Sequence, residues 1–238
     1  MKITQKVVIL ILSVIISTSC IYTGSSLKGN GNVVEENRKV GDFEEIIVSR
    51  GMNVYISQGD ITKVMVKADE NLLDAIETRM EGDVLEVTSN ANIRTATVKK
   101  VFITTPDISS IRTSSGSNVF SETIITSKNL DLSASSGSNL KLEIKTGKVD
   151  ASVSSGSNIN IEGITDYFYG KASSGSNLKA ENLSSKRSEM KASSGANIWI
   201  NVKEELQAEA SSGGNIFYYG NPESTDIEKS SGGNVIKK

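Results

Sequence analysis

Side chains that commonly carry catalysis are scarce in this sequence of 238 residues, which contains no histidine and a single cysteine, Cys20. Imidazole proton shuttling, histidine-assisted nucleophilic attack and nearly every zinc site need imidazole or clustered thiolates. The chain carries 26 Lys and Arg residues against 28 Asp and Glu residues, so its net charge gives no electrostatic drive toward nucleic acid. We therefore expect a non-enzymatic protein with no catalytic residues, no metal, no cofactor and no nucleic-acid partner.

Four glutamates recur at nearly constant intervals, each six residues after a glycine of a repeated motif: Glu122, Glu143, Glu162 and Glu181. If the repeats stack, these carboxylates form a surface column in which each neighbouring pair repels by less than about 1 kcal/mol in water. Such a column could bind Ca²⁺ or a basic partner, or could provide the carboxylates of a polysaccharide lyase or hydrolase. The alternative, which we favour, is a solvated face on which Lys141 and Lys179 supply counter-charge.

A second set of side chains is apolar and lies near the C-terminus. Trp199, Phe217 and Ile236 each follow a motif glycine by four residues, and Tyr219 has the same parity as Phe217. Aromatic residues on adjacent rungs could stack on sugar rings or pack against a partner, which would be a glycan, another envelope protein or a second copy of this chain. The alternative is that a C-terminal segment or a neighbouring loop covers them as a cap. This set is the best candidate for a binding surface.

All these side chains lie at fixed offsets from the pentapeptide Ser-Ser-Gly-(Ser/Ala/Gly)-Asn, which occurs seven times at spacings of 18 to 21 residues. The asparagines of the seven copies are Asn118, Asn139, Asn158, Asn177, Asn197, Asn215 and Asn234. Apolar residues alternate on both sides of each copy, as in Leu130, Leu132 and Ala134 before it and Leu140, Leu142 and Ile144 after it. This period of two predicts short strands, each with one apolar face, joined by a polar corner.

One repeat cannot bury its own apolar face, whereas stacked repeats share a continuous core. The sequence therefore predicts an all-β fold, a right-handed parallel β-helix (β-solenoid) with rungs of about 19 residues spaced about 4.8 Å apart. In this fold the corner glycine adopts a positive φ, and the asparagines form a ladder of amide hydrogen bonds along the stack. The alternative for the serine and asparagine column is a glycan-binding or ice-binding array.

The first residues have the pattern of a bacterial export signal. Residues 7–16 form an apolar run about 15 Å long as a helix, too short for a bilayer core of about 30 Å. Residues 17–19 are small and precede Cys20, which resembles a relaxed lipobox, so we expect a lipoprotein signal peptide at 1–19 and lipidation at Cys20. Attachment to the bacterial outer membrane follows, with the periplasmic or cell-surface face left open; ordinary secretion is the alternative.

The rest of the chain divides into a tether at 20–32 and a single β-helix domain at 33–238, with irregular rungs at 33–110 and regular ones at 111–238. The irregular part contains one good copy of the motif at Gly51 and Asn53 and a weaker one that ends at Asn92. Between them, a short helix with Asp69 as N-cap precedes a hairpin whose turn is 81–83.

The sequence resembles the bacterial family called putative auto-transporter adhesin, head GIN domain. The resemblance is carried by residues 29–33 (GNGNV), 43–49 (FEEIIVS), 53–59 (NVYISQG), 68–73 (ADENLL) and the Ser-Gly-Ser-Asn corners. It implies a β-helical envelope protein of bacteria such as Bacteroidetes and brings no catalytic residues with it. We therefore expect a lipid-anchored adhesin or binding module. The alternatives are a polysaccharide-active β-helix enzyme and a purely structural spacer.

Overall fold

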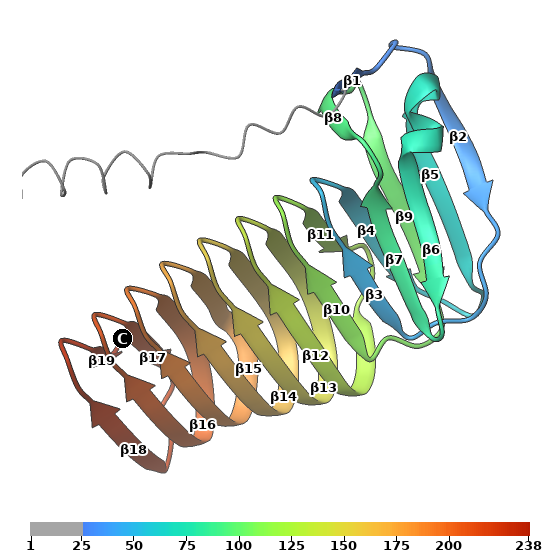
Figure 1. Ribbon diagram of the computed structural model, residues 1–238. Coiled ribbons are helices and arrows are strands. Elements are labelled where there is room, and N and C mark those ends of the chain that lie inside the picture. Colours follow the sequence, from blue (N-terminus) through green and yellow to red (C-terminus); the bar gives the residue numbers. More distant parts are fainter. Residues whose placement is uncertain (1–25) are drawn as a thin grey trace, which may run out of the picture.

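A computed structural model describes residues 26–238 of the chain; the predicted signal peptide, Cys20 and the first part of the tether lie outside these residues. The described chain is almost entirely β-structure, with one short 3-10 helix. A row of stacked strands extends away from a more irregular end that contains the helix (Figure 1). Among residues 26–238, no helix combines the length and apolar character needed to cross a membrane.

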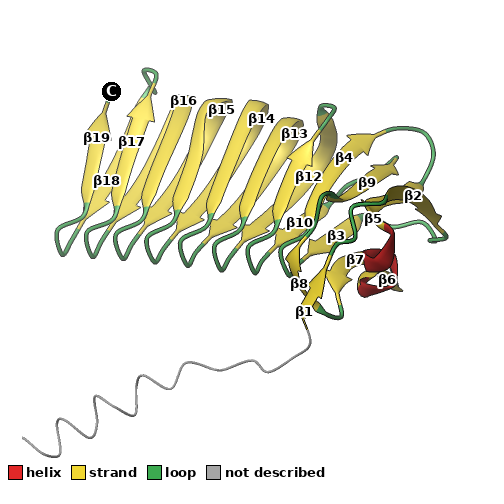
Figure 2. Ribbon diagram, turned by 90° about the horizontal axis from the view of Figure 1, so that it is seen from above, coloured by secondary structure: helices red, strands yellow, loops and turns green. Residues whose placement is uncertain are grey.

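The regular part is a stack of parallel strands, seen from above in Figure 2. Its strands are β10 (Ser110–Thr113), β11 (Asn118–Ser121), β12 (Ile125–Ala134), β13 (Asn139–Val153), β14 (Asn158–Ala172), β15 (Asn177–Ala192), β16 (Asn197–Ala210), β17 (Asn215–Tyr219), β18 (Ser224–Lys229) and β19 (Asn234–Lys237). Equivalent residues of successive repeats are direct partners, as in Asn139 opposite Asn158 and Leu140 opposite Ile159. The prediction of a parallel β-solenoid with rungs of about 19 residues is therefore confirmed, while its right hand stays a prediction.

Each corner is a two-residue turn in which both central residues have a positive φ. At the corner of Gly137, Ser136 has a φ of 55° and Gly137 a φ of 71°, and the Ser138 N–H donates to the Ser135 carbonyl over 3.3 Å. These angles are those of a type I′ turn. The sequence predicted the positive φ of the glycine but not that of the serine before it. The stack stabilises this conformation, because Gly137 N–H donates to the Ser155 carbonyl of the next rung over 3.1 Å.

A single apolar core runs through the whole stack, from Phe43 to Ile216. Inward side chains from both strands of each rung fill it, and at the seven Ser-Ser-Gly corners the residue after the glycine is small, namely serine, alanine or glycine. In the last two rungs this residue is glycine, and a Cβ on Gly214 would lie 2.5 Å from the Ala192 carbonyl carbon of the preceding rung. The backbone at these last two corners therefore leaves no room for a side chain, unlike the earlier corners, where serine or alanine fits.

The irregular end contains β1 (Ser26–Lys28), β2 (Val33–Arg38), β3 (Glu45–Val48), β4 (Asn53–Gln58), β5 (Lys63–Asp69), β6 (Ile76–Glu81), β7 (Val84–Ser89), β8 (Asn92–Thr95) and β9 (Lys99–Thr105). Strands β3 and β4 form the first rung, because they pair in parallel with β10 and β11, with Asn53 opposite Asn118. Beyond this rung the pairings β2–β5, β5–β9 and β6–β7 are antiparallel. The predicted hairpin is β6–β7, which turns at Gly82 with a φ of 64°.

Two predictions for this end need correction. The weaker copy of the motif follows the stack only as far as β7, where Val87 lies opposite Val48. Asn92 then leaves the stack in β8, and Lys100 of β9 lies opposite Asn53. The reason is length, because twelve residues separate Val87 from Lys100 where four separate Val48 from Asn53. Because β8 pairs with β1, the predicted tether is wrong from residue 26 on: these residues belong to the folded domain.

The predicted helix is the 3-10 helix η1 (Glu70–Ala75), with Asp69 at the N-cap position. The Asp69 side chain makes no capping hydrogen bond to the helix. It is fully buried and instead accepts hydrogen bonds from the N–H groups of Gly31, over 3.1 Å, and Thr97, over 2.6 Å. Asp69 therefore joins the segment before β2 to the segment before β9.

Candidate functional site

The strand that follows each corner has one outward face, on which a column of side chains runs the full length of the stack beside the corner asparagines. Each member lies two residues after a corner asparagine or, in β9, two residues after Lys100, which pairs with Asn53. In spatial order the members, called here the outer column, are Phe102, Tyr55, Phe120, Lys141, Asn160, Lys179, Trp199, Phe217 and Ile236. Aromatic residues lie toward both ends, and two lysines lie between them.

The C-terminal part of the outer column contains three of the predicted binding residues. The rings of Trp199 and Phe217 stack with their centroids 5.3 Å apart and their planes at 21°. The Lys179 Nζ lies 5.8 Å from the Trp199 centroid, and the Lys238 Nζ lies 5.1 Å from the Phe217 centroid. The ring faces are thus covered by neighbours along the stack, so a pyranose could stack on Trp199 only if Lys179 moved. Ring edges and lysine side chains form the accessible surface.

Ile236, the third of these residues, and Tyr219, the fourth predicted residue, extend this surface. Ile236 lies opposite Phe217 in the last rung and is 41% exposed. Tyr219 lies in the adjacent column, opposite Asn201, and is half-buried. In the part of the chain that the structure describes, the last segment is β19, which continues the stack rather than folding back over the rings (Figure 1).

Sequence reasoning missed a second aromatic stack at the other end of the outer column. Tyr55 lies between Phe102 and Phe120, with centroid distances of 5.2 Å and 5.3 Å, and the Lys100 Nζ lies 4.9 Å from the Tyr55 centroid. Tyr55 and Phe120 share the same offset from Asn53 and Asn118, a signal that could have identified them. Phe102 could not be found in this way, because β9 carries no motif.

The predicted glutamate column is only partly formed. Glu143 and Glu162 lie directly opposite each other. Together with Glu122 they line a shallow depression of about 320 Å³ beside Tyr55, Phe120 and Lys141. A bulge in β15 displaces Glu181, whose Oε2 is buried without a hydrogen-bond partner. Residues 26–238 contain no group of three or more His, Cys, Asp or Glu residues that could hold a metal ion.

The corner asparagines form one continuous ladder that also includes Asn53 of the first rung. Each Nδ2 donates to the Oδ1 of the neighbouring asparagine nearer the irregular end, over 2.8 to 3.1 Å. At that end Asn53 donates to the Lys99 carbonyl over 3.2 Å. All bonds point the same way, so the amide groups are used within the stack and the ladder has a structural role.

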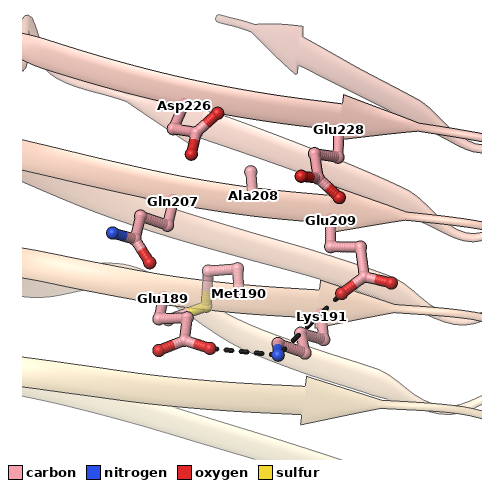
Figure 3. Close-up of a pocket in the computed structure, with 8 residues that line it drawn as sticks. All are labelled: Glu189, Met190, Lys191, Gln207, Ala208, Glu209, Asp226 and Glu228. Atoms are coloured by element: carbon pink, nitrogen blue, oxygen red, sulfur yellow. Dashed lines mark ion pairs between the residues drawn. The ribbon is translucent and has the colours of Figure 1, made fainter.

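A charged depression, whose lining residues are drawn in Figure 3, lies on the strand segments that precede the last corners. It measures about 220 Å³ and is lined by Glu189, Met190, Lys191, Gln207, Ala208, Glu209, Asp226 and Glu228. Lys191 pairs with Glu189 over 3.1 Å and lies 3.9 Å from Glu209. The hydrogen bond and the charge of Glu189 raise the pKa of Lys191 above its ordinary value. This solvent-exposed ion-pair network neutralises part of an acidic surface.

A stack of parallel rungs with side-chain columns on its outward faces defines a repetitive β-solenoid protein. The chain belongs to the family described as "Putative auto-transporter adhesin, head GIN domain", whose model matches residues 42–222. The resemblance found in the sequence is therefore confirmed.

Several solved structures share this fold. A protein described as a putative adhesin from Bacteroides fragilis has a TM-score of 0.83 at 20% identity, and the match covers 89% of this chain and 100% of that one. A second putative adhesin, from Parabacteroides merdae, has a TM-score of 0.73 at 19% identity and coverage of 90% and 99%. A protein described as a putative lipid binding protein, from Parabacteroides distasonis, has a TM-score of 0.71 at 20% identity and coverage of 90% and 100%. At these identities the likeness establishes the fold alone. No curated protein matches the chain.

Proposed function

We propose that the protein is a non-enzymatic adhesin of the bacterial cell envelope, which contacts a macromolecular partner through its outer column. The observation that carries this proposal is the column itself: nine outward side chains in register, with stacked aromatics at each end. The strands beneath them pair in parallel from rung to rung, so the surface is pre-organised and loses little conformational freedom on binding. The names of the family and of its structural relatives agree with this function.

The chemistry of the outer column favours a broad, shallow contact. Aromatic edges and the alkyl stems of Lys141 and Lys179 provide apolar area, while the ammonium groups stay at the surface. Since the faces of Trp199 and Phe217 are already covered, we favour another envelope protein or a second copy of this chain over a glycan as the partner of this end.

The test is a binding assay in which the immobilised chain captures cells, envelope fractions and glycans. The variants are Trp199→Ala with Phe217→Ala at one end of the column, and Tyr55→Ala with Phe120→Ala at the other. The matched control is Tyr169→Ala, because Tyr169 is a half-buried outward aromatic on the opposite sheet. We expect at least a tenfold loss of capture for the column variants and none for the control.

Other outcomes identify the competing functions. Release of sugar products from a captured polysaccharide would identify an enzyme, and absence of binding to any surface would identify a spacer. Equal loss in all variants, including the control, would show that the outer column is not the contact surface. Far-ultraviolet circular dichroism of each variant checks that the rungs are retained.

The lipid anchor at Cys20 and attachment to the outer membrane are part of the same proposal, supported by the small residues before Cys20 and the short apolar run. The test is fractionation of cells that produce the wild-type chain or Cys20→Ser. We expect the wild type in the outer-membrane fraction with incorporated fatty acid, and the variant without it. A wild-type protein with no acyl chain would refute the anchor.

A further inference from the structure

The corner of the first rung departs from the other seven corners in its sequence. The first of the two residues with a positive φ is Arg50, at 55°, where every other copy has serine. An arginine is costly in this left-handed region, by about 1–2 kcal/mol. The serines of the other corners share this conformation, so the long cationic side chain of Arg50 is what sets the first corner apart. Here the Arg50 Nη1 donates to the Ser89 carbonyl over 2.9 Å, which holds the guanidinium beside the corner.

The segment between β7 and β9, residues 90–98, is called here the excursion and lies next to this corner. The chain leaves the stack after Ser89, whose Oγ donates to the Ala91 carbonyl over 2.9 Å, and β8 then pairs with β1. Ala91, Asn92 and Ile93 of this excursion face the corner across a pocket of about 450 Å³. No other rung of the described chain has such an insertion at its corner, so the pocket occurs once in a repetitive structure.

Arg50 and Lys99 contribute two cations to the lining of this pocket, Asn92 an amide and Ser115 a hydroxyl. Ala91 and Ile93 contribute the apolar part of the lining. Lys99 is the first residue of β9, and a Cβ added to Gly51 would lie 3.5 Å from the Lys99 Nζ. Within residues 26–238, neither Arg50 nor Lys99 has an ion-pair partner. Burial lowers the pKa of the Lys99 ammonium below its ordinary value, as expected for a desolvated cation without a counter-charge.

We propose that this pocket binds a carboxylated sugar, with the carboxylate between the Arg50 guanidinium and the Lys99 ammonium. The Asn92 amide and the Ser115 hydroxyl then bind ring hydroxyls, and Ile93 packs against the C–H face of the ring. A volume of about 450 Å³ accommodates one or two sugar rings. The pocket shares no residue with the outer column. The inference rests on the proposed function only in that it assumes a binding protein.

The test is isothermal titration calorimetry of the purified chain with digalacturonic acid, methyl galactoside and inorganic phosphate. We expect binding of digalacturonic acid alone, weakened at least tenfold by Arg50→Ser and by Lys99→Gln. Arg50→Ser restores the serine of the other corners, so this variant should unfold at the same or a higher urea concentration than the wild type. The matched control is Lys171→Gln, an exposed lysine on β14 outside every depression described above, and should bind like the wild type.

Each other result overturns the inference. Phosphate that binds as tightly as digalacturonic acid would identify a general anion site, and equal binding of methyl galactoside would show that the cations do not select the ligand. No heat of binding at millimolar digalacturonic acid, or full binding by Arg50→Ser, would also refute it. These outcomes leave the proposed adhesin untouched, because the capture assay tests that function with residues of the outer column.

Discussion

Replacing Asn158 by alanine interrupts the asparagine ladder near its middle, and we expect it to lower the free energy of unfolding by about 2 kcal/mol. Asn158 donates to Asn139 over 2.9 Å and accepts from Asn177 over 2.9 Å. Alanine removes both hydrogen bonds and leaves a half-buried acceptor on Asn139 and a half-buried donor on Asn177. A net contribution of about 1 kcal/mol per bond gives this estimate.

The hydrogen bond between Asn158 and Asn177 allows the prediction to be tested with a double variant. Asn177→Ala alone also removes two bonds, because Asn177 accepts from Asn197 over 3.1 Å. The double variant removes three bonds rather than four, so its loss should be about 3 kcal/mol, with a coupling of about 1 kcal/mol between the two sites. Asn234 lies exposed at the end of the ladder and makes one such bond. Its replacement by alanine should therefore cost only about 0.5 kcal/mol.

Urea unfolding of the whole chain, followed by far-ultraviolet circular dichroism, measures these free energies provided that the slope of the transition is unchanged. Hydrogen exchange of the corner amides checks whether the loss is confined to the neighbouring rungs, as expected for a stack of nearest-neighbour contacts. If Asn158→Ala costs no more than Asn234→Ala, or if the two single losses add up without coupling, the ladder does not stabilise the stack in the way proposed.

Three further predictions concern the core, the charges and the open end of the stack. Gly214→Ala should lower the free energy of unfolding by about 2 kcal/mol or more, because its Cβ would overlap the backbone of the preceding rung; an unchanged urea midpoint would contradict this. Burial and the facing carboxylate of Asp131 raise the pKa of Asp150, so the native state loses stability as the pH rises through that pKa. Asp150→Asn should therefore stabilise the chain by about 0.5 kcal/mol at pH 7 and by progressively less as the pH falls; a pH-independent difference would show that the charge is not the cause. Lys229 and Lys237 occupy inward register positions in the last rung, opposite Ala210 and Tyr218, where charge discourages pairing with another sheet edge. Changing both lysines to valine should produce end-to-end association in analytical ultracentrifugation, and an unchanged sedimentation coefficient at all concentrations would refute this role.

The regular rungs could be predicted because the stack repeats one local rule. The repeat consists of a polar corner flanked by alternating apolar residues and occurs seven times. Because a single copy cannot bury its apolar face, the copies stack, and the corner asparagines of neighbouring copies then contact one another. The positive φ of Ser136 and its equivalents was not predicted, because serine rarely adopts that conformation and the turn is enforced by hydrogen bonds from the neighbouring rung.

Parts of the candidate sites could not be predicted from the repeat. The rung, its corner and the outward positions could be predicted from the residues alone, because these features depend on period and local turn chemistry. The stacking of Phe102 of β9 on Tyr55, the bulge that displaces Glu181 and the pocket between the excursion at Asn92 and Lys99 become visible only in the folded chain. Each of these depends on how the chain pairs where the repeat is broken. At such places the register is set by long-range packing, so the spacing of residues along the chain no longer predicts their distance in space.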